Sequence, residues 1–451
     1  MGRSFLIRNA TIVNEGRSFH GDVLIEDGII TGVRSTDPPL PPPGGGEIEV
    51  IDATGLLLFP GIIDDQVHFR DPGLTQKGDL HTETRAAVAG GVTSFMDMPN
   101  TSPKAVTLDV LEEKYRIASE KSLANYSFFL GATNDNMDEI LKADPRTICG
   151  VKVFMGASTG NMLVDDPATL EAIFAGSRMI VAIHSEDEIV IRENLQRYRE
   201  IYGEEIPVEA HPLIRSAEAC LRSTERAVVL AKEHGTRLHV LHLSTAAEAS
   251  LLDPPGPLEN KRITGEVCVH HLWFDDRDYA RLGALIKWNP AIKSEAEKNG
   301  LFNALLDDRI DLVATDHAPH LIEEKSNPYT SCPSGAPLIQ HSLPMMLEFW
   351  RQGRIPLEKI VEKMCHNPAI LYRIANRGFI REGYAADLVL VDPDRPWTVT
   401  KENILYKCGW SPVDGVTFNT TVTHTFVNGH PVYVNGIFDE TVKGRRLLFN
   451  L

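Results

Sequence analysis

Five short apolar runs in this chain each end in a side chain of a type that binds metals. This repetition constrains the fold more than any other feature. The runs end at His68, Lys152, His184, His242 and Asp316. Each has the length and β-branched content of a buried strand, and helix-like sequence follows it. Parallel strands joined by helical crossovers present their carboxyl ends at one rim, so these side chains are expected to meet there.

The spacing of the apolar runs predicts an α/β fold, a TIM (β/α)8 barrel. Between residues 59 and 380 the strand-like runs alternate with helix-like segments, and eight such units are the number that closes a barrel. The predicted strands lie near residues 62–67, 92–97, 125–131, 150–154, 179–183, 237–242, 263–268 and 310–315. After His242, the Thr245-x-x-Glu248 pattern is a capping box that predicts the start of a helix.

The two ends of the chain show a different, β-type pattern. Residues 1–58 and 381–451 alternate apolar and polar positions in short segments, which predicts one small β-sandwich domain built from both ends. Asn428-Gly429 between two such segments is a strong type I′ hairpin signal. The Pro- and Gly-rich stretch 37–46 cannot continue a strand ladder and is expected to be an exposed loop.

Charge and composition exclude several classes of protein. The chain of 451 residues has a formal charge of −17 and a pI near 5.4, which disfavours a nucleic-acid or anionic membrane surface. No signal-peptide core or membrane-spanning apolar stretch is visible, so a cytoplasmic protein is expected. The six cysteines are scattered singly, which favours reduced packing residues over a disulfide framework or a zinc knuckle.

Three motifs together give the chain a family resemblance. They are the segment 60–73, which contains His68 and Arg70, then Met98-Pro99-Asn100, and finally the segment 315–320. With these motifs the whole chain resembles the dihydroorotases of the amidohydrolase superfamily. The resemblance implies reversible, metal-dependent hydrolysis of (S)-dihydroorotate to N-carbamoyl-L-aspartate in de novo pyrimidine biosynthesis. It also implies one or two zinc ions in each subunit.

The resemblance assigns ligands to two ions at the barrel rim. His68 and Asp316 would hold the first ion and His184 and His242 the second, with a carboxylated Lys152 as the bridge. An ammonium group at the end of a buried strand is costly to desolvate, which makes a carbamate at Lys152 reasonable. One position departs from the family pattern, because Gln66 stands where the first strand usually has a histidine. An amide oxygen is a weaker zinc donor than imidazole, so the first ion is expected to bind more weakly than the second.

The same resemblance implies roles in catalysis and substrate binding. Asp316 would be the general base and then the general acid. Arg70 lies two residues after His68, and its planar guanidinium suits bidentate binding of the substrate carboxylate. The residues implied in substrate binding are Arg70, Asn100, Asn289, His320 and Ala336.

Other functions and partners stay open at the level of sequence. A related cyclic amidase, such as a hydantoinase, dihydropyrimidinase or allantoinase, is one alternative. A metal-poor homologue that serves as a structural partner of aspartate transcarbamoylase is another, with Gln66 as its first sign. The family also implies a homodimer. Five further histidines are interpreted as structural: His81, His270, His271, His317 and His366.

Overall fold

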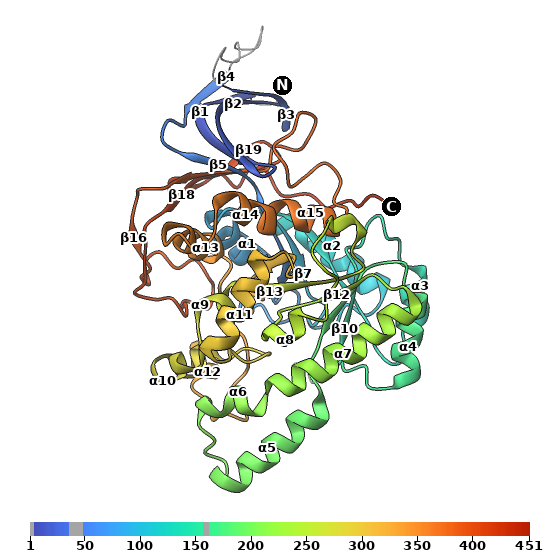
Figure 1. Ribbon diagram of the computed structural model, residues 1–451. Coiled ribbons are helices and arrows are strands. Elements are labelled where there is room, and N and C mark those ends of the chain that lie inside the picture. The colour runs from blue at the N-terminus through green and yellow to red at the C-terminus, as the bar shows by residue number, and fades with distance from the viewer. Residues whose placement is uncertain (1–3, 36–47, 157–161) are drawn as a thin grey trace.

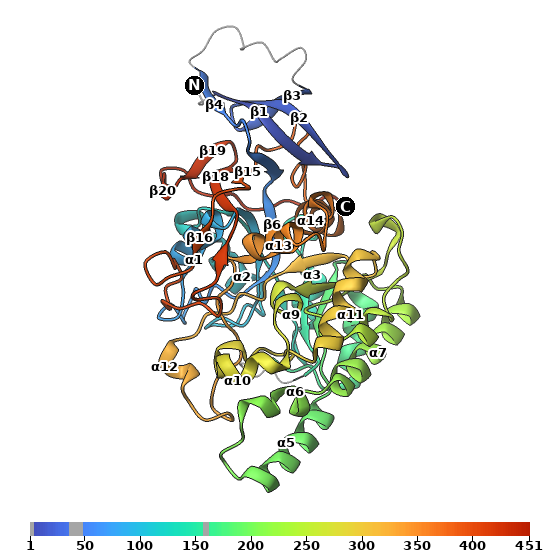
Figure 2. The same ribbon diagram turned by 60° about the vertical axis from the view of Figure 1, so that its left-hand side comes forward.

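The computed structural model describes residues 4–35, 48–156 and 162–451. A closed barrel with surrounding helices forms the larger part, and a β-rich sheet made from both ends of the chain lies at one end of the molecule (Figure 1). Helix α5 (Glu188–Tyr202) projects at the opposite end, as both views show (Figure 2). The Pro- and Gly-rich stretch 37–46 lies outside the described residues.

Parallel strands form the barrel, in sequence order, and almost every residue in them is buried. They are β6 Ile62–Val67, β7 Val92–Asp97, β8 Asn125–Phe128, β9 Leu130–Gly131, β10 Val151–Phe154, β11 Val181–His184, β12 Leu238–Val240, β13 Ile263–Cys268 and β14 Leu312–Ala314. Strands β8 and β9 are one barrel strand interrupted at Phe129. The eight strands expected from the apolar runs are therefore present, with ends that differ by a few residues.

Backbone hydrogen bonds close the ring at two places. The amide of His68, just after β6, donates to the carbonyl oxygen of His317 after β14 at 2.7 Å. On the far side, the Phe129 amide donates to Asp97 O at 3.1 Å and the Leu130 amide to Gly150 O at 3.1 Å. Closure leaves no free sheet edge and brings the carboxyl ends of all the strands to one rim.

Helices surround the barrel and alternate with its strands. The α-helices are α1 Leu80–Ala89, α2 Leu108–Lys121, α3 Met137–Lys142, α4 Pro167–Gly176, α5 Glu188–Tyr202, α6 His211–Ile214, α7 Ala217–His234, α8 Ala246–Ala249, α9 Val269–Trp273, α10 Tyr279–Leu282, α11 Glu295–Leu306, α12 Ile322–Lys325, α13 Ser342–Arg351, α14 Leu357–Val361 and α15 Asn367–Leu371. A π-helical turn, η5 Glu362–His366, joins the last two, and the 3₁₀ turns are η1 Val208–Ala210, η2 Leu258–Asn260, η3 Asp276–Asp278 and η4 Gly283–Ile286.

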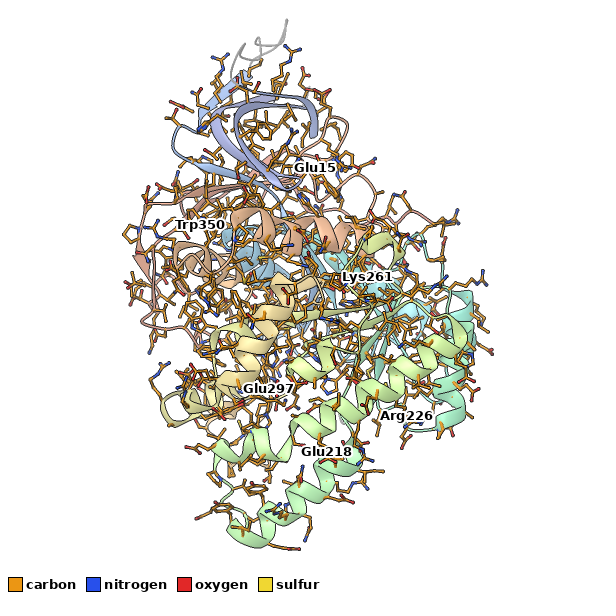
Figure 3. All side chains as sticks on the ribbon, viewed as in Figure 1. Glu15, Glu218, Arg226, Lys261, Glu297 and Trp350 are labelled. Atoms are coloured by element: carbon orange, nitrogen blue, oxygen red, sulfur yellow. The ribbon has the colours of Figure 1, made fainter. Side chains whose placement is uncertain are left out.

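Helix α7 shows why these segments are helical. The Ser216 side chain accepts the Ala219 amide hydrogen at the start of the helix, and Gly235 ends it with φ of 66°. Small residues recur every three or four positions and are buried against the barrel, whereas Glu218 and Arg226 lie on the solvent side (Figure 3). The helix expected after His242 is α8, where the Thr245 hydroxyl accepts the Glu248 amide hydrogen at 3.2 Å.

The β-rich sheet contains nine strands from the two ends of the chain. Its order is β20-β19-β18-β15-β5-β1-β2-β3, and β4 pairs with β1. The strands are β1 Ser4–Asn14, β2 Arg17–Glu26, β3 Ile29–Ser35, β4 Ile48–Asp52, β5 Leu57–Pro60, β15 Leu388–Asp392, β18 Thr421–Val427, β19 His430–Val434 and β20 Ile437–Phe438. A separate pair, β16 Trp397–Thr398 and β17 Thr417–Phe418, lies beside α13. Strands of both ends pack on each other, as in the edge-to-face contact of Phe5 and Phe426 at 5.5 Å.

The predicted hairpin is present between β18 and β19. Asn428 and Gly429 both have positive φ, 52° and 76°, as a type I′ turn requires. At the seam with the barrel, the Glu15 amide donates to His366 Nε2 at 2.9 Å. The predicted domain boundaries at 58 and 380 stay predictions. Within residues 4–35, 48–156 and 162–451, no helix is long and apolar enough to cross a membrane.

Candidate active site

A pocket opens at the carboxyl ends of the barrel strands, and we call it the rim pocket. Its lining residues come from strand ends and the loops that follow them. They are Gln66, His68, Arg70, Asn100, Lys152, Phe154, His184, His242, Asn289, Asp316, Ala318, Ser334 and Gly335. All five predicted metal-type residues line it, as do Arg70, Asn100 and Asn289. The other two predicted residues, His320 and Ala336, are buried directly behind this lining.

Lys152, His184 and His242 form one half of the pocket, which we call the Lys152 side. His184 Nδ1 lies 3.0 Å from His242 Nε2, so two imidazole nitrogens converge on the same place. Burial lowers the pKa of both histidines, that of His242 to well below its ordinary value. Neutral imidazole is the form that binds metals.

Glu186, which the sequence interpretation missed, fixes the orientation of His184. The other ring nitrogen of His184, Nε2, donates to Glu186 Oε2 at 2.8 Å. Burial opposes ionisation of this carboxyl group, but Arg215 and His184 lower the pKa of Glu186 to about 2. An ionised acceptor at Nε2 leaves the Nδ1 lone pair of His184 facing the pocket, as an outer carboxylate does for metal-binding histidines. The acidic residue two positions after His184 was the only available sequence signal.

Lys152 is buried within the barrel. Its side chain is almost inaccessible to solvent, and the Nζ atom lies 4.7 Å from the ring centre of Phe154. Burial lowers the pKa of Lys152 to about 7, although the charges of Asp316 and Glu266 oppose this. Near neutral pH a large fraction of the side chain is therefore an uncharged amine, the form that reacts with CO₂.

Gln66, His68 and Asp316 form the other half, which we call the Asp316 side. His68 Nε2 lies 3.0 Å from Asp316 Oδ1, and the Gln66 amide nitrogen donates to the same oxygen at 3.3 Å. The Gln66 amide oxygen faces the thiol of Cys268, with Sγ at 3.7 Å. The second nitrogen of His68, Nδ1, lies 2.7 Å from Asn100 Oδ1. These side chains therefore satisfy one another's hydrogen-bonding groups.

A buried cationic group lies beside the Asp316 side. Arg70 Nε donates to the carbonyl oxygen of Pro319 at 3.1 Å, and its NH2 lies 3.0 Å from His320 Nε2. Burial lowers the pKa of Arg70 to about 10, against the charge of Asp316, so the guanidinium stays charged at neutral pH. Lys77 Nζ lies 3.1 Å from the opposite ring nitrogen of His320. The result is a fixed positive group at the pocket wall.

The far wall consists of backbone held by buried lysines. Lys325 Nζ donates to the carbonyl oxygens of Pro333 and Gly335 at 2.9 and 2.8 Å. The Ala336 carbonyl oxygen accepts the hydrogen of the Ala318 amide at 3.0 Å, and Ala318 and Gly335 line the pocket. Asn289 Oδ1 is buried and has no hydrogen-bond partner in the described part of the chain, so an acceptor is available at the wall.

Three residues of the rim pocket have strained backbones. Arg70, His242 and Asp316 have φ of 67°, 41° and 46°, a left-handed region that non-glycine residues rarely occupy. Each follows the end of a barrel strand, where the chain must turn outward. Such conformations cost roughly 1–3 kcal/mol each and cluster at functional sites. The strained residues therefore indicate that the functional site lies at this rim of the barrel.

A second polar group lies inside the barrel, and the sequence interpretation missed it. We call it the interior cluster: Asp65, His239, Glu266 and Tyr372, all buried. His239 Nε2 lies 3.1 Å from Glu266 Oε2 and 3.5 Å from Asp65 Oδ2, and the Tyr372 hydroxyl donates to Asp65 at 2.9 Å. The sequence signal for this cluster was the presence of acidic residues within the apolar runs of β6 and β13.

The histidines interpreted as structural have packing or hydrogen-bonding roles. His270 stacks on Trp288 with ring centres 4.0 Å apart, and His271 Nε2 donates to Pro290 O at 3.2 Å. His317 Nε2 donates to Glu83 at 2.9 Å, while its Nδ1 accepts the Leu338 amide hydrogen. His270 and His271 also lie with Cys268 in a compact buried group next to the rim pocket.

The two sides of the rim pocket differ as metal sites. On the Lys152 side, converging imidazoles and a buried amine that can be carboxylated fit a divalent transition metal. On the Asp316 side, the donor atoms are already hydrogen-bonded to one another, and the Gln66 group that faces Asp316 is an N–H donor. The described residues therefore fit one ion well and a second ion poorly.

Comparison with known proteins agrees with this geometry. The sequence pattern of the amidohydrolase family matches residues 57–432. A dihydroorotase from Halobacterium salinarum is 32% identical over 399 residues, which are 87% of this chain and 91% of that protein. An allantoinase from Deinococcus radiodurans is 32% identical over 456 aligned positions, gaps included, and the alignment covers 99% of each chain. Among solved structures, the L-hydantoinase (dihydropyrimidinase) from Arthrobacter aurescens has a TM-score of 0.91 and 27% identity, covering 98% of this chain and 99% of its own.

The chain belongs to the amidohydrolase family. The family match and the hydantoinase structure confirm the expected barrel with its β-rich domain. This family is generally metal-dependent, which agrees with the donor groups at the rim. The relatives carry different names, dihydroorotase, allantoinase and hydantoinase, so the choice of substrate depends on the pocket itself.

Proposed function

We propose that this protein is a dihydroorotase, which hydrolyses the ring amide of (S)-dihydroorotate to N-carbamoyl-L-aspartate and catalyses the reverse condensation. Its relatives are named for enzymes that act on cyclic amides, which supports the broader class. The observation that carries the narrower proposal is the buried guanidinium of Arg70 in the pocket wall. Dihydroorotate has a ring carboxylate, whereas allantoin and unsubstituted hydantoin do not.

Arg70 is suited to bind that carboxylate. It is buried yet lines the pocket, and contacts with Pro319 and His320 fix its plane. A guanidinium group that is already held in one orientation loses little entropy when it binds a carboxylate, and burial strengthens the interaction. The amide of Asn100 lies on the same wall, and His320 supports Arg70 from behind. In this proposal Asn289 and the backbone at Gly335 and Ala336 contact the ring.

Asp316 is the residue placed to move the proton. Its Oδ1 lies between His68 and Gln66 at the pocket floor, where it can take a proton from the attacking water and give it to the leaving ring nitrogen. A divalent ion held by Lys152, His184 and His242 would supply Lewis-acid activation of water and of the amide carbonyl. Arg70 then orients the ring, and the buried walls exclude bulk water.

A substrate panel tests the proposal. Purified protein reconstituted with zinc is assayed on dihydroorotate, allantoin, hydantoin and dihydrouracil, and we expect dihydroorotate to have the highest kcat/KM. Arg70→Gln should lower kcat/KM for dihydroorotate by about 10- to 100-fold, as expected for loss of a charged hydrogen bond. The exposed Arg146→Gln is the matched control. Faster hydrolysis of allantoin or hydantoin would identify a related cyclic amidase. No hydrolysis of any of the four would favour the structural partner of aspartate transcarbamoylase.

The remaining features of the proposal have separate tests. We propose zinc as the metal and a carboxylated Lys152 as one ligand, in a cytoplasmic homodimer of the pyrimidine pathway. Elemental analysis identifies the metal, and carbon NMR after exposure to labelled CO₂ detects the carbamate. Sedimentation measures the oligomeric state, with and without aspartate transcarbamoylase.

A further inference from the structure

We infer that the rim pocket binds one divalent ion, on the Lys152 side. On the Asp316 side, a hydrogen bond from Gln66 to Asp316 takes the place of a second ion. Gln66 is a positioning residue: clamped by Cys268, it holds Asp316 through its amide N–H group. The inference rests on the proposed function for the role of Asp316, but its main measurement does not depend on any activity.

The orientation of the Gln66 amide carries the argument. An amide presents two donor hydrogens on one side and an acceptor oxygen on the other. Here Nε2 is directed at Asp316 Oδ1 at 3.3 Å and Oε1 at Cys268 Sγ at 3.7 Å. A carboxylate only accepts and a thiol can donate, so both neighbours favour the same orientation.

The opposite orientation would be unfavourable in the described structure. It would place Oε1 of Gln66 against Asp316 Oδ1, two acceptors at about hydrogen-bond distance. Gln66 is 1% exposed and Cys268 is fully buried, so this contact is shielded from bulk solvent. Gln66 therefore presents an N–H group, and not an oxygen ligand, toward Asp316.

The oxygen that a second ion would need is already in use. Asp316 Oδ1 faces both Gln66 Nε2 and His68 Nε2. The contacts of His68 with Asn100 and of Gln66 with Cys268 extend this network away from the pocket. A cation would have to break these contacts and then rely on an amide oxygen, a weak donor.

The Lys152 side shows the contrast. His184 Nδ1 faces His242 Nε2, while Nε2 of His184 is committed to an ionised carboxylate. Among the residues that the structure describes, His242 Nδ1 has no hydrogen-bond partner. Two neutral imidazoles that converge in this way are best satisfied by a cation between them.

Metal stoichiometry is the decisive measurement. Metal-free protein is dialysed to saturation against Zn²⁺, and bound zinc is measured by elemental analysis; a Co²⁺-loaded sample is examined by electron paramagnetic resonance. We expect about one ion per chain and the spectrum of an isolated Co²⁺ ion. Gln66→His, which adds an imidazole next to His68, should raise the content to about two ions and give spin-coupled Co²⁺.

A second set of variants tests the positioning role. Gln66→Met keeps the length of the side chain but removes the N–H donor. It should leave the metal content at about one ion and KM near wild type, while kcat falls by about 10- to 100-fold. Cys268→Ser keeps a donor to Gln66 and should retain most of kcat, whereas Cys268→Ala should lose part of it. Cys365→Ala is the matched control, because this buried thiol bonds the carbonyl oxygen of Pro60, the last residue of β5, just before β6 begins.

Two results would overturn the inference. One is a content of two ions in the wild-type protein, which is decisive even if every variant fails to fold. The other is a kcat in Gln66→Met equal to that of wild type. Failure of the proposed function looks different: a protein that binds one ion but does not hydrolyse dihydroorotate supports the one-ion site and refutes only the activity.

Discussion

His239 lies within strand β12 and His242 lies two residues after this strand ends, yet their surroundings shift their pKa values in opposite directions. His239 belongs to the interior cluster, where Asp65 and Glu266 outweigh the effect of burial and raise its pKa to about 9. His242 lines the rim pocket, where burial and the neighbouring His184 lower its pKa to well below the ordinary value. At neutral pH the first is charged and the second neutral.

The difference separates a structural group from a functional one. The interior cluster contains the side-chain types of a metal site, but burial and the charge of Asp65 raise the pKa of Glu266 well above its ordinary value, which favours its neutral form. A charged His239 then balances Asp65 without a metal ion. The rim pocket offers neutral donors that open toward a cavity. The Glu266 carboxylate also accepts the His242 amide hydrogen at 3.3 Å, so the interior cluster supports the rim directly.

The largest effect is expected from Lys152→Met in the rim pocket. Removal of the carboxylated side chain that β10 would contribute to the metal site should abolish zinc binding after dialysis and reduce hydrolysis to background, with the fold retained. Elemental analysis and circular dichroism measure the two parts. Lys142→Met, at an exposed position of α3, should keep full zinc content. Normal zinc content in Lys152→Met would contradict the assignment of this side chain to the metal site.

The corresponding change in the interior cluster, His239→Gln, should affect stability instead. It leaves the buried acidic groups of Asp65 and Glu266 without their cationic partner, which costs about 3–5 kcal/mol in the free energy of unfolding. Urea denaturation measures this loss. The folded variant should bind as much zinc as wild type. If zinc is lost while the urea midpoint stays unchanged, the interior cluster is itself a metal site and the comparison fails.

A smaller effect is expected from Glu186→Gln, which changes the support of His184. The amide can still accept the Nε2 hydrogen but no longer carries the charge that fixes the tautomer. Zinc affinity should fall by about 10- to 100-fold. Competition with a chelator measures it. Glu193→Gln on the exposed face of α5 is the control, and equal affinities in the two variants would rule out this role.

The smallest effect is the pH dependence that the interior cluster gives to stability. Because the folded-state pKa of His239 is about 9 and its ordinary value is 6.5, its contribution is complete below pH 6.5 and is lost as the pH rises through 9. The slope for one proton is at most about 1.4 kcal/mol per pH unit. Urea denaturation between pH 6 and 9.5, roughly this window, should show the decrease, and His239→Gln should flatten it. The exposed His20→Gln should not.

Much of the barrel was predictable because its signals are local. A strand such as β11 is a run of apolar residues followed by a ligand-type side chain and a helix cap, and each part is visible within about ten residues. The hairpin at Asn428-Gly429 is equally local. The acidic residues of the interior cluster were missed because Asp65 and Glu266 each lie within an apolar run. The apolar pattern predicts a buried strand there and does not assign a role to a single acidic residue within it.

The sequence alone determined the order of strands and helices and the set of side chains that reach the rim. Strand ends of a parallel barrel point the same way whatever their neighbours are. The tertiary structure decided which of these side chains pair. Gln66 and Asp316 are 250 positions apart, and only closure of the ring between β6 and β14 brings the amide to the carboxylate. Hydrogen bonds act over a few ångströms and are directional, so no local pattern could show whether Gln66 offers its oxygen or its N–H group.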